Sequence, residues 1–142
     1  MQPFHLAIQV RNLEEARHFY THYLQCSTGR SSESWLDLNL YGHQLVCHLN
    51  AKIGNEGQLP VIHNPVDSHG VPVPHFGVVL GMDDWQNLAD NLREKGVEFV
   101  IEPTIRFRGK PGEQATMFFY DPTGNALEFK AFSNIEEQLF AV

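Results

Sequence analysis

Apolar and polar residues alternate in several short stretches of the chain. Residues 4–10 show this alternation first, and residues 35–40 and 44–49 show it again on either side of a Tyr41-Gly42 turn. Because the side chains of a strand point alternately to its two faces, each stretch predicts a β-strand with one buried face.

Between the first two of these strands, apolar residues recur at helical spacing. Asn12 precedes the run and Glu15 follows three residues later, a pairing typical of a helix N-terminus. The apolar stripe predicts an amphipathic helix that begins after Asn12. Its members are Leu13, Ala16, Phe19, Tyr20, Tyr23 and Leu24.

The same order of elements returns in the second half of the chain. Residues 75–80 align with residues 5–10, and a helix is predicted from Asp83 to a Lys95-Gly96 end. Three further strands are predicted at 97–101, 116–120 and 126–132. This repeat of roughly 70 residues indicates two fused copies of one module.

The single domain predicted over residues 1–142 therefore contains modules at about 1–52 and 73–132. Residues 50–74 hold four of the eight prolines and no sustained periodicity, so we predict a long loop that shapes a substrate site. For the tail at 133–142 we expect either fraying or packing on a partner subunit.

Composition narrows the classes of function. The 142 residues include 10 Lys and Arg against 17 Asp and Glu, for a net charge of −7. Such acidity disfavours nucleic acid and anionic membrane surfaces as partners. Neither a membrane span nor a signal peptide is recognisable, and two cysteines make no disulfide framework. We therefore expect a cytoplasmic protein.

Eight histidines are the unusual feature of this composition. His5 and His75 hold the same position in the two copies, and His48 and Glu128 lie on the last predicted strand of each copy. A carboxylate between two apolar residues on a strand needs a partner, which a metal ion would supply. Imidazoles with one carboxylate suit Fe(II), Mn(II), Ni(II), Co(II) or Zn(II) better than Ca(II) or Mg(II).

The remaining histidines are predicted to lie outside this site. We expect surface positions for His18, His22 and His43, whereas His63 and His69 of the long loop are candidates for substrate contact.

Three segments resemble the vicinal oxygen chelate superfamily, which includes glyoxalase I, bleomycin and fosfomycin resistance proteins and extradiol dioxygenases. They are residues 4–10, residues 74–78 and, above all, residues 119–128 with an Asp-Pro-x-Gly turn and a Glu four residues after the Gly. The resemblance implies an α+β fold in which two βαβββ modules form a curved mixed sheet around a central metal cleft, and frequent homodimers.

The resemblance also implies a ligand set. His5, His75 and Glu128 would hold one divalent metal, Fe(II) being favoured, and the metal would chelate neighbouring oxygens of a small-molecule substrate. His48 stands where glyoxalase I-like members have a ligating Glu, as a fourth ligand or a neighbour of the metal. We expect Glu128 and His48 to be the catalytic residues.

Three functions remain open from the sequence. The favoured one is an extradiol-like, ring-cleaving Fe(II) dioxygenase, although Phe118 replaces a Tyr of that signature and residues 106–114 lack its His. Arg106, Arg108 or Lys110 are candidates to stabilise an anionic intermediate. The alternatives are a glyoxalase I-like lyase, isomerase or related transferase using metal-assisted proton transfer, and a metal-free ligand-binding resistance protein.

Overall fold

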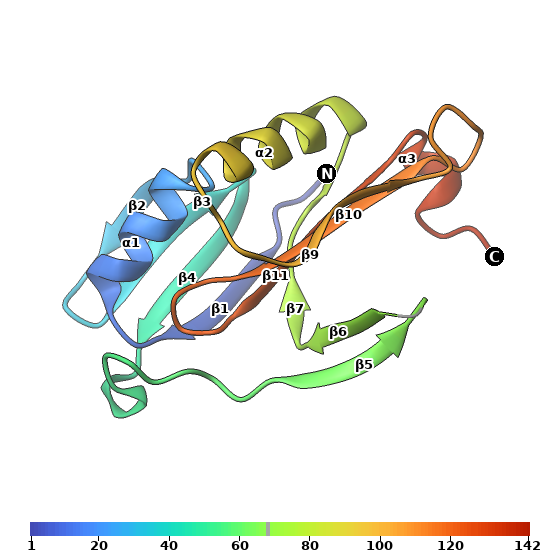
Figure 1. Ribbon diagram of the computed structural model, residues 1–142. Helices are drawn as coiled ribbons and strands as arrows, with labels where there is room; N and C mark the ends of the chain where they lie inside the picture. The colour runs from blue at the N-terminus through green and yellow to red at the C-terminus, as the bar shows by residue number, and fades with distance from the viewer. Residues whose placement is uncertain (68) are drawn as a thin grey trace. The chain divides into compact units, whose positions relative to one another are not determined.

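The computed structural model describes residues 1–67 and 69–142, and the chain folds as two compact units (Figure 1). The first unit comprises residues 1–73 with residues 121–125, and the second comprises residues 74–120 and 126–142. Each unit joins helices to a mixed sheet, so the predicted α+β class is confirmed.

The first unit has the strand and helix order of one βαβββ module. Its sheet order is β1-β4-β3-β2, with β1 parallel to β4 and the other neighbours antiparallel. The elements are β1 (His5–Val10), α1 (Leu13–His22), β2 (Ser27–Ser31), β3 (Trp35–Leu40) and β4 (His43–Leu49).

Helix α1 begins where the sequence predicts, because the Asn12 side chain accepts a 2.8 Å hydrogen bond from the Glu15 amide. The helix buries Phe19 and Tyr20, and one face of the sheet is buried as well. The opposite face is mostly exposed or half-buried, with Val46 as its buried member, and we call it the open face of the first sheet. It carries His5, Gln9, Trp35, Asp37, Gln44 and His48.

The second unit repeats this order, with its first strand in two pieces. Strand β11 lies between β10 and β7, β8 pairs with β11 beyond β7, and β9 forms the other edge. The elements are β7 (His75–Phe76), β8 (Val79–Leu80), α2 (Met82–Glu94), β9 (Phe99–Arg106), β10 (Gln114–Tyr120), β11 (Ala126–Phe132) and α3 (Ile135–Gln138).

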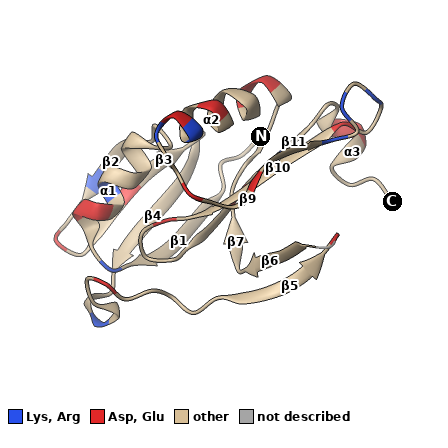
Figure 2. Ribbon diagram, in the orientation of Figure 1, with Lys and Arg blue, Asp and Glu red and all other residues tan. Residues whose placement is uncertain are grey.

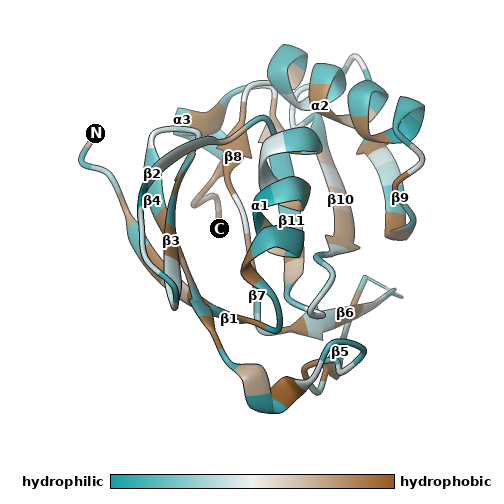
Figure 3. Cartoon of the chain, turned by 90° about the vertical axis from the view of Figure 1, so that its left-hand side faces the viewer, coloured by the Kyte–Doolittle hydropathy of each residue, from teal (hydrophilic) through white to brown (hydrophobic). Residues whose placement is uncertain are grey.

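Helix α2 covers one face of the second sheet. The ribbon of this helix alternates between hydrophilic and hydrophobic colours in Figure 3, and its buried residues include Trp85 and Leu92. The Trp85 indole N–H donates a 2.9 Å hydrogen bond to the Phe129 carbonyl. The other face carries Glu128 and Lys130 on β11, Thr116 and Phe118 on β10, and Thr104 and Arg106 on β9. We call it the Glu128 face.

The predicted strand at 75–80 is wrong in one respect, since it is interrupted after Phe76. Gly77 passes so close to β11 that a Cβ atom there would lie 1.6 Å from the Glu128 carbonyl oxygen. The strand predicted at 97–101 instead runs from Phe99 to Arg106. Strand β2 was not predicted, because all five of its residues are exposed and none is apolar.

The predicted loop at 50–74 is also wrong in part. It contains a 3₁₀ turn (Ala51–Ile53) and a hairpin of β5 (Ile62–Val66) with β6 (His69–Val73). Two strands without further neighbours tolerate proline, since every strand is an edge and its missing N–H can face away from the partner. Residue 68 of this loop lies outside the described residues.

Two smaller observations complete the fold. The tail at 133–142 contains α3, whose N-cap Asn134 accepts a hydrogen bond from the Glu137 amide. None of the helices in the described residues has both the length and the apolar composition that a membrane span requires.

Candidate functional site

His75 and Glu128 lie together on the Glu128 face of the second unit. Strands β7 and β11 run parallel with His75 opposite Ala126, so His75 and Glu128 point to the same side. The His75 Nε2 atom lies 3.0 Å from Glu128 Oε2. The structure therefore brings two of the four predicted ligands into contact.

The Glu128 carboxylate is held at both oxygens. Its side chain is only 13% exposed and follows the fully buried Leu127 on β11. The Thr116 hydroxyl donates a 3.0 Å hydrogen bond to Oε1, the oxygen that does not face His75. The Lys130 ammonium lies 3.9 Å from the same Oε1 atom. Thr116 could not be predicted from the sequence, because only the β10–β11 register shows that it reaches Glu128.

Phe118 forms the apolar side of this pair. It lies opposite Glu128 in the β10–β11 register, and its ring meets the His75 imidazole edge-on at 5.1 Å. A phenol at this position would place a hydroxyl beside the pair. The phenylalanine instead places an apolar ring edge-on to the imidazole, whose side chain is 30% exposed.

His5 opens β1 on the open face of the first sheet. Its Nδ1 atom lies 2.8 Å from the Gln44 side-chain oxygen, and Gln44 is also its partner in the β1–β4 register. An amide oxygen that accepts Nδ1–H fixes the tautomer and leaves Nε2 as the donor for a metal. Gln44, like Thr116, carries no sequence signal that would have pointed to this contact.

His48 lies on the same open face as His5, but further along the strands. It is opposite Gln9 on β1 and Trp35 on β3, four residues beyond the Gln44 level. At a strand rise of about 3.3 Å per residue, that is about 13 Å along the sheet. The register therefore places Gln44, and not His48, beside His5.

Within either unit, no three His, Cys, Asp or Glu side chains of the described residues gather closely enough to hold a metal ion. The second unit contributes the His75–Glu128 pair, and the first contributes His5 with its Gln44 partner.

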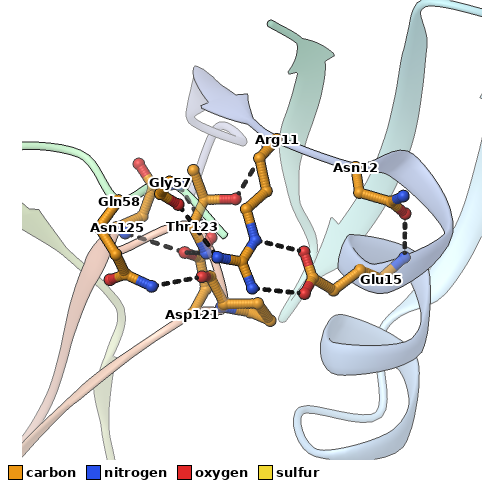
Figure 4. Close-up of polar contacts among 9 residues, drawn as sticks. Arg11, Asn12, Glu15, Gly57, Gln58, Asp121, Thr123 and Asn125 are labelled. Carbon is orange, nitrogen blue, oxygen red and sulfur yellow. Dashed lines mark hydrogen bonds and ion pairs between the residues drawn. The ribbon is translucent and has the colours of Figure 1, made fainter. Parts of the chain in front are cut away.

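The Asp121–Asn125 turn makes a dense polar network with the first unit (Figure 4). The Arg11 amide donates to Thr123 Oγ1 at 3.0 Å, and the Arg11 guanidinium binds Glu15 and the Gly57 carbonyl. Glu15 raises the pKa of Arg11 through this contact. The polar groups of the turn find their hydrogen-bond partners inside this network, which indicates a structural role for the turn.

The other predicted residues lie apart from these contacts. The His43 Nδ1 atom accepts a 2.8 Å hydrogen bond from the Phe4 amide, and the rings of His18 and His22 stack on α1. His63 is opposite Pro72 and His69 is opposite Val66, so the two lie on opposite faces of their hairpin. Arg108 and Lys110 lie in the β9–β10 connection.

The cysteines are both free and buried. Burial raises the pKa of the Cys26 and Cys47 thiols to about 12, so neither is a thiolate near neutral pH.

Comparison with known proteins places the whole arrangement in one family. Residues 2–129 match the Glyoxalase/Bleomycin resistance protein/Dioxygenase superfamily. The chain belongs to this superfamily. Its members include glyoxalases, bleomycin resistance proteins and dioxygenases, so membership sets the fold and leaves the reaction open.

Solved structures agree. A glyoxalase/bleomycin resistance protein/dioxygenase from Alicyclobacillus acidocaldarius is 32% identical over 95% of this chain and 94% of that chain, with a TM-score of 0.72. The fosfomycin resistance protein FosX from Listeria monocytogenes is 14% identical over 92% of this chain and 93% of that chain, with a TM-score of 0.63, and shows the fold alone. No curated protein matches the chain.

Proposed function

We propose that the chain is a divalent-metal-dependent enzyme of the vicinal oxygen chelate type, with His5, His75 and Glu128 as metal ligands. The observation that carries this proposal is the 3.0 Å separation of His75 Nε2 and Glu128 Oε2. Two donors that each lie about 2.1 Å from one ion at a right angle are about 3 Å apart. The pair thus has the spacing that a shared ion requires.

The surroundings of the ligands support the same proposal. A metal-bound histidine usually donates its second N–H to an oxygen, and Gln44 offers that oxygen to His5. Thr116 holds Glu128 through the oxygen that does not face His75, which leaves the other oxygen for a metal. Two imidazoles and one carboxylate form the set found in non-haem Fe(II) oxygenases, so Fe(II) stays the favoured ion, with Ni(II), Co(II), Mn(II) or Zn(II) as alternatives.

The reaction we favour is extradiol-like ring cleavage of a small substrate with neighbouring oxygen donors. When bound, the metal would hold those oxygens and act as a Lewis acid. The chain's own contribution is to orient Glu128 through Thr116 and to place the apolar Phe118 ring beside His75. His48 lies on the open face with His5 but about 13 Å further along the sheet, so we propose it only as a contact for an outlying part of the substrate.

A second candidate is metal-assisted proton transfer of the glyoxalase I type. Phe118 favours it, because this side chain offers no hydroxyl beside His75. Glu128 would then accept the substrate proton.

Metal analysis with oxygen uptake separates these functions. We expect protein purified without chelator to contain about one equivalent of iron and to consume oxygen with a member of a catechol panel. Protein that contains nickel, cobalt or zinc and consumes no oxygen would instead support the proton-transfer reaction. A metal-free protein that takes up no added metal would contradict both and support a ligand-binding resistance protein.

Glu128→Ala tests the ligand assignment. We expect this variant to lose the metal, because one of three charged or imidazole donors is removed. Glu102→Ala is the matched control, since Glu102 is an exposed carboxylate on β9 of the same unit. Full metal occupancy in Glu128→Ala would contradict the site.

We also propose that the enzyme acts as a cytoplasmic homodimer. The two buried free thiols suit a reducing compartment. Light scattering coupled to size exclusion would show a particle of one chain if the dimer is wrong.

A further inference from the structure

His18 and His22 lie one turn apart on the exposed side of α1. Residues four apart on a helix share a face, with their Cβ atoms about 5–6 Å apart. Both side chains are exposed, and the centres of their imidazole rings lie 5.0 Å apart with 17° between the ring planes. No other two histidines in the sequence have this spacing. Helix α1 therefore presents a pair of imidazoles side by side.

The separation of the two rings fits a single metal ion. A nitrogen ligand lies about 2.0–2.1 Å from an ion such as Zn(II), which places the centre of a bound imidazole ring about 3.2 Å from the ion. Two such rings have their centres about 4.5 Å apart at a right angle and about 5.2 Å apart at a tetrahedral angle. The observed 5.0 Å lies within this range. Rotation of each exposed ring about its Cβ–Cγ bond, a soft torsion, would turn one nitrogen of each toward a shared ion.

Tyr23 holds the two rings on the same side of the helix. Its ring meets the His22 ring edge-on at 4.9 Å and the His18 ring edge-on at 6.2 Å. Because one aromatic side chain contacts both imidazoles, they are already gathered before any ion binds. Little side-chain freedom would then be lost on binding.

The charges around the pair favour a cation. The acidic residues of α1, Glu14 and Glu15, lie in its first turn (Figure 2), and Glu14 is one turn before His18. His22 lies in the last turn, where the partial negative charge of the helix C-terminus attracts positive charge. Arg17 precedes His18 in the chain, and its charge is partly offset because its Nε atom lies 3.5 Å from Glu14 Oε1.

The pair is separate from the candidate ligands described above. Helix α1 packs on the buried face of the first sheet, whereas His5 lies on the open face. His75 and Glu128 belong to the second unit. An ion on α1 would therefore be additional to an ion at the candidate site.

We propose that His18 and His22 form a second metal-binding site, which takes one divalent ion such as Cu(II), Ni(II) or Zn(II) with water as the remaining ligands. Imidazole nitrogen suits these ions, and the affinity of such a site rises from Fe(II) through Ni(II) to Cu(II). The α1 site is therefore selective against the Fe(II) that we favour at the other site. The inference does not depend on the proposed function.

The test is a Cu(II) titration of the untagged protein followed by NMR. Paramagnetic Cu(II) broadens the amide signals of nearby residues, so broadening in α1 in competition with glycine measures binding at this site alone. The variants are His18→Ala and His22→Ala. His63→Ala is the matched control, because His63 is also exposed but has Pro72 opposite it and His69 on the other face of its hairpin.

A spacing variant separates chelation by the pair from binding to single histidines. Arg17→His combined with His18→Ala keeps two histidines on α1 but places them five residues apart. They then lie about 140° apart around the helix, compared with about 40° in the wild type. The variant also lacks the Arg17 charge, which on its own would make Cu(II) binding tighter. Weaker binding would therefore reflect the spacing.

We expect Cu(II) to broaden the signals of the last two turns of α1 in wild type and in His63→Ala to the same extent. His18→Ala, His22→Ala and the spacing variant should each bind Cu(II) at α1 at least tenfold more weakly, because a second donor on the same rigid helix no longer reinforces the first. Thermal unfolding without metal shows whether each variant keeps its fold.

Two results would overturn the inference. One is that the α1 signals of the wild type stay sharp at one equivalent of Cu(II), and the other is that the spacing variant binds as tightly as the wild type. Broadening confined to β7 and β11 would refute the α1 site and support the candidate ligands of the proposed function. Broadening confined to α1 would support this inference and count against those ligands.

Discussion

The Tyr20 hydroxyl donates a 2.8 Å hydrogen bond to Asp121 Oδ2, and both side chains are buried. Asp121 also accepts hydrogen bonds from the amides of Thr123 and Asn125 and from the Asn125 side chain. A buried carboxylate with this many donors holds the β10–β11 turn in one conformation. The aspartate of the Asp-Pro-x-Gly motif, Asp121, therefore has a structural role in this turn.

Tyr20→Phe should lower the free energy of unfolding by about 1.5–3 kcal/mol at neutral pH, because it removes a hydrogen bond to a charged group. Urea denaturation measures this difference. Tyr23→Phe is the control, since Tyr23 lies at the end of α1 and is only half-buried. Equal losses in the two variants would contradict the importance of the Asp121 contact.

The pH dependence of unfolding follows from the same residue. Burial raises the pKa of Asp121, and its hydrogen bonds from Asn125 and Tyr20 lower it again in part. The folded state therefore holds this proton more tightly than the unfolded state does. The contribution of Asp121 to stability is complete below about pH 3.9, the ordinary value for Asp, and is lost as the pH rises through the raised pKa.

In Tyr20→Phe the free energy of unfolding should fall by more as the pH rises, because the variant lacks a hydrogen-bond donor that favours the ionised form of Asp121. Its stability deficit relative to wild type should accordingly be smaller at pH 4 than at pH 7. Denaturation curves at both pH values test this, and a deficit that does not change with pH would count against it.

Thr116→Val should weaken metal binding about tenfold, because second partners of a ligating carboxylate commonly contribute that much. Competition with a coloured chelator measures the affinity. Thr104→Val is matched to it, since Thr104 is opposite Thr116 but its hydroxyl binds the Glu102 carbonyl instead. Loss of affinity in both variants would point to a general disturbance of the sheet.

Gly77→Ala should destabilise the second unit by about 3 kcal/mol and displace Glu128, because overpacking against backbone cannot be relieved by a rotamer change. The added Cβ would lie 1.6 Å from the Glu128 carbonyl oxygen. At Gly81 an added Cβ meets nothing within 4 Å, so Gly81→Ala serves as the comparison. Similar melting temperatures for the two variants would refute this reading of Gly77.

His48→Ala should keep a full complement of metal, whereas His5→Ala should not. The register places Gln44 beside His5 and places His48 four residues further along β4. Elemental analysis of both variants tests the difference. Equal metal loss in the two would restore His48 as a ligand.

Much of the fold could be predicted where the sequence carries a periodic signal. Strand β11 has the bounds expected, 126–132, and α1 begins after its expected cap at Asn12. Strand β2 and the β5–β6 hairpin could not be predicted, because exposed strands need no apolar alternation. Their formation depends on pairing with partners elsewhere in the chain.

Some residues of the candidate site could likewise be predicted from the sequence, and others could not. The internal repeat and the carboxylate between apolar residues were sufficient to predict that His75 and Glu128 belong to one site, and the structure places them in contact. Thr116 and Gln44 could not be found in this way, since a threonine or glutamine on a strand is ordinary. Only the strand register shows which side chain each one reaches.

The membership of residues 121–125 in the first unit has a consequence for biosynthesis. A nascent chain translated only as far as Val73 has the strands of that unit but lacks the acceptor for Tyr20 and the hydroxyl that binds the Arg11 amide. The first unit therefore reaches its final stability only after most of the second has left the ribosome. A fragment of residues 1–73 expressed alone would lack the same two contacts and would be less stable. Adding residues 74–142 as a separate fragment should restore that stability.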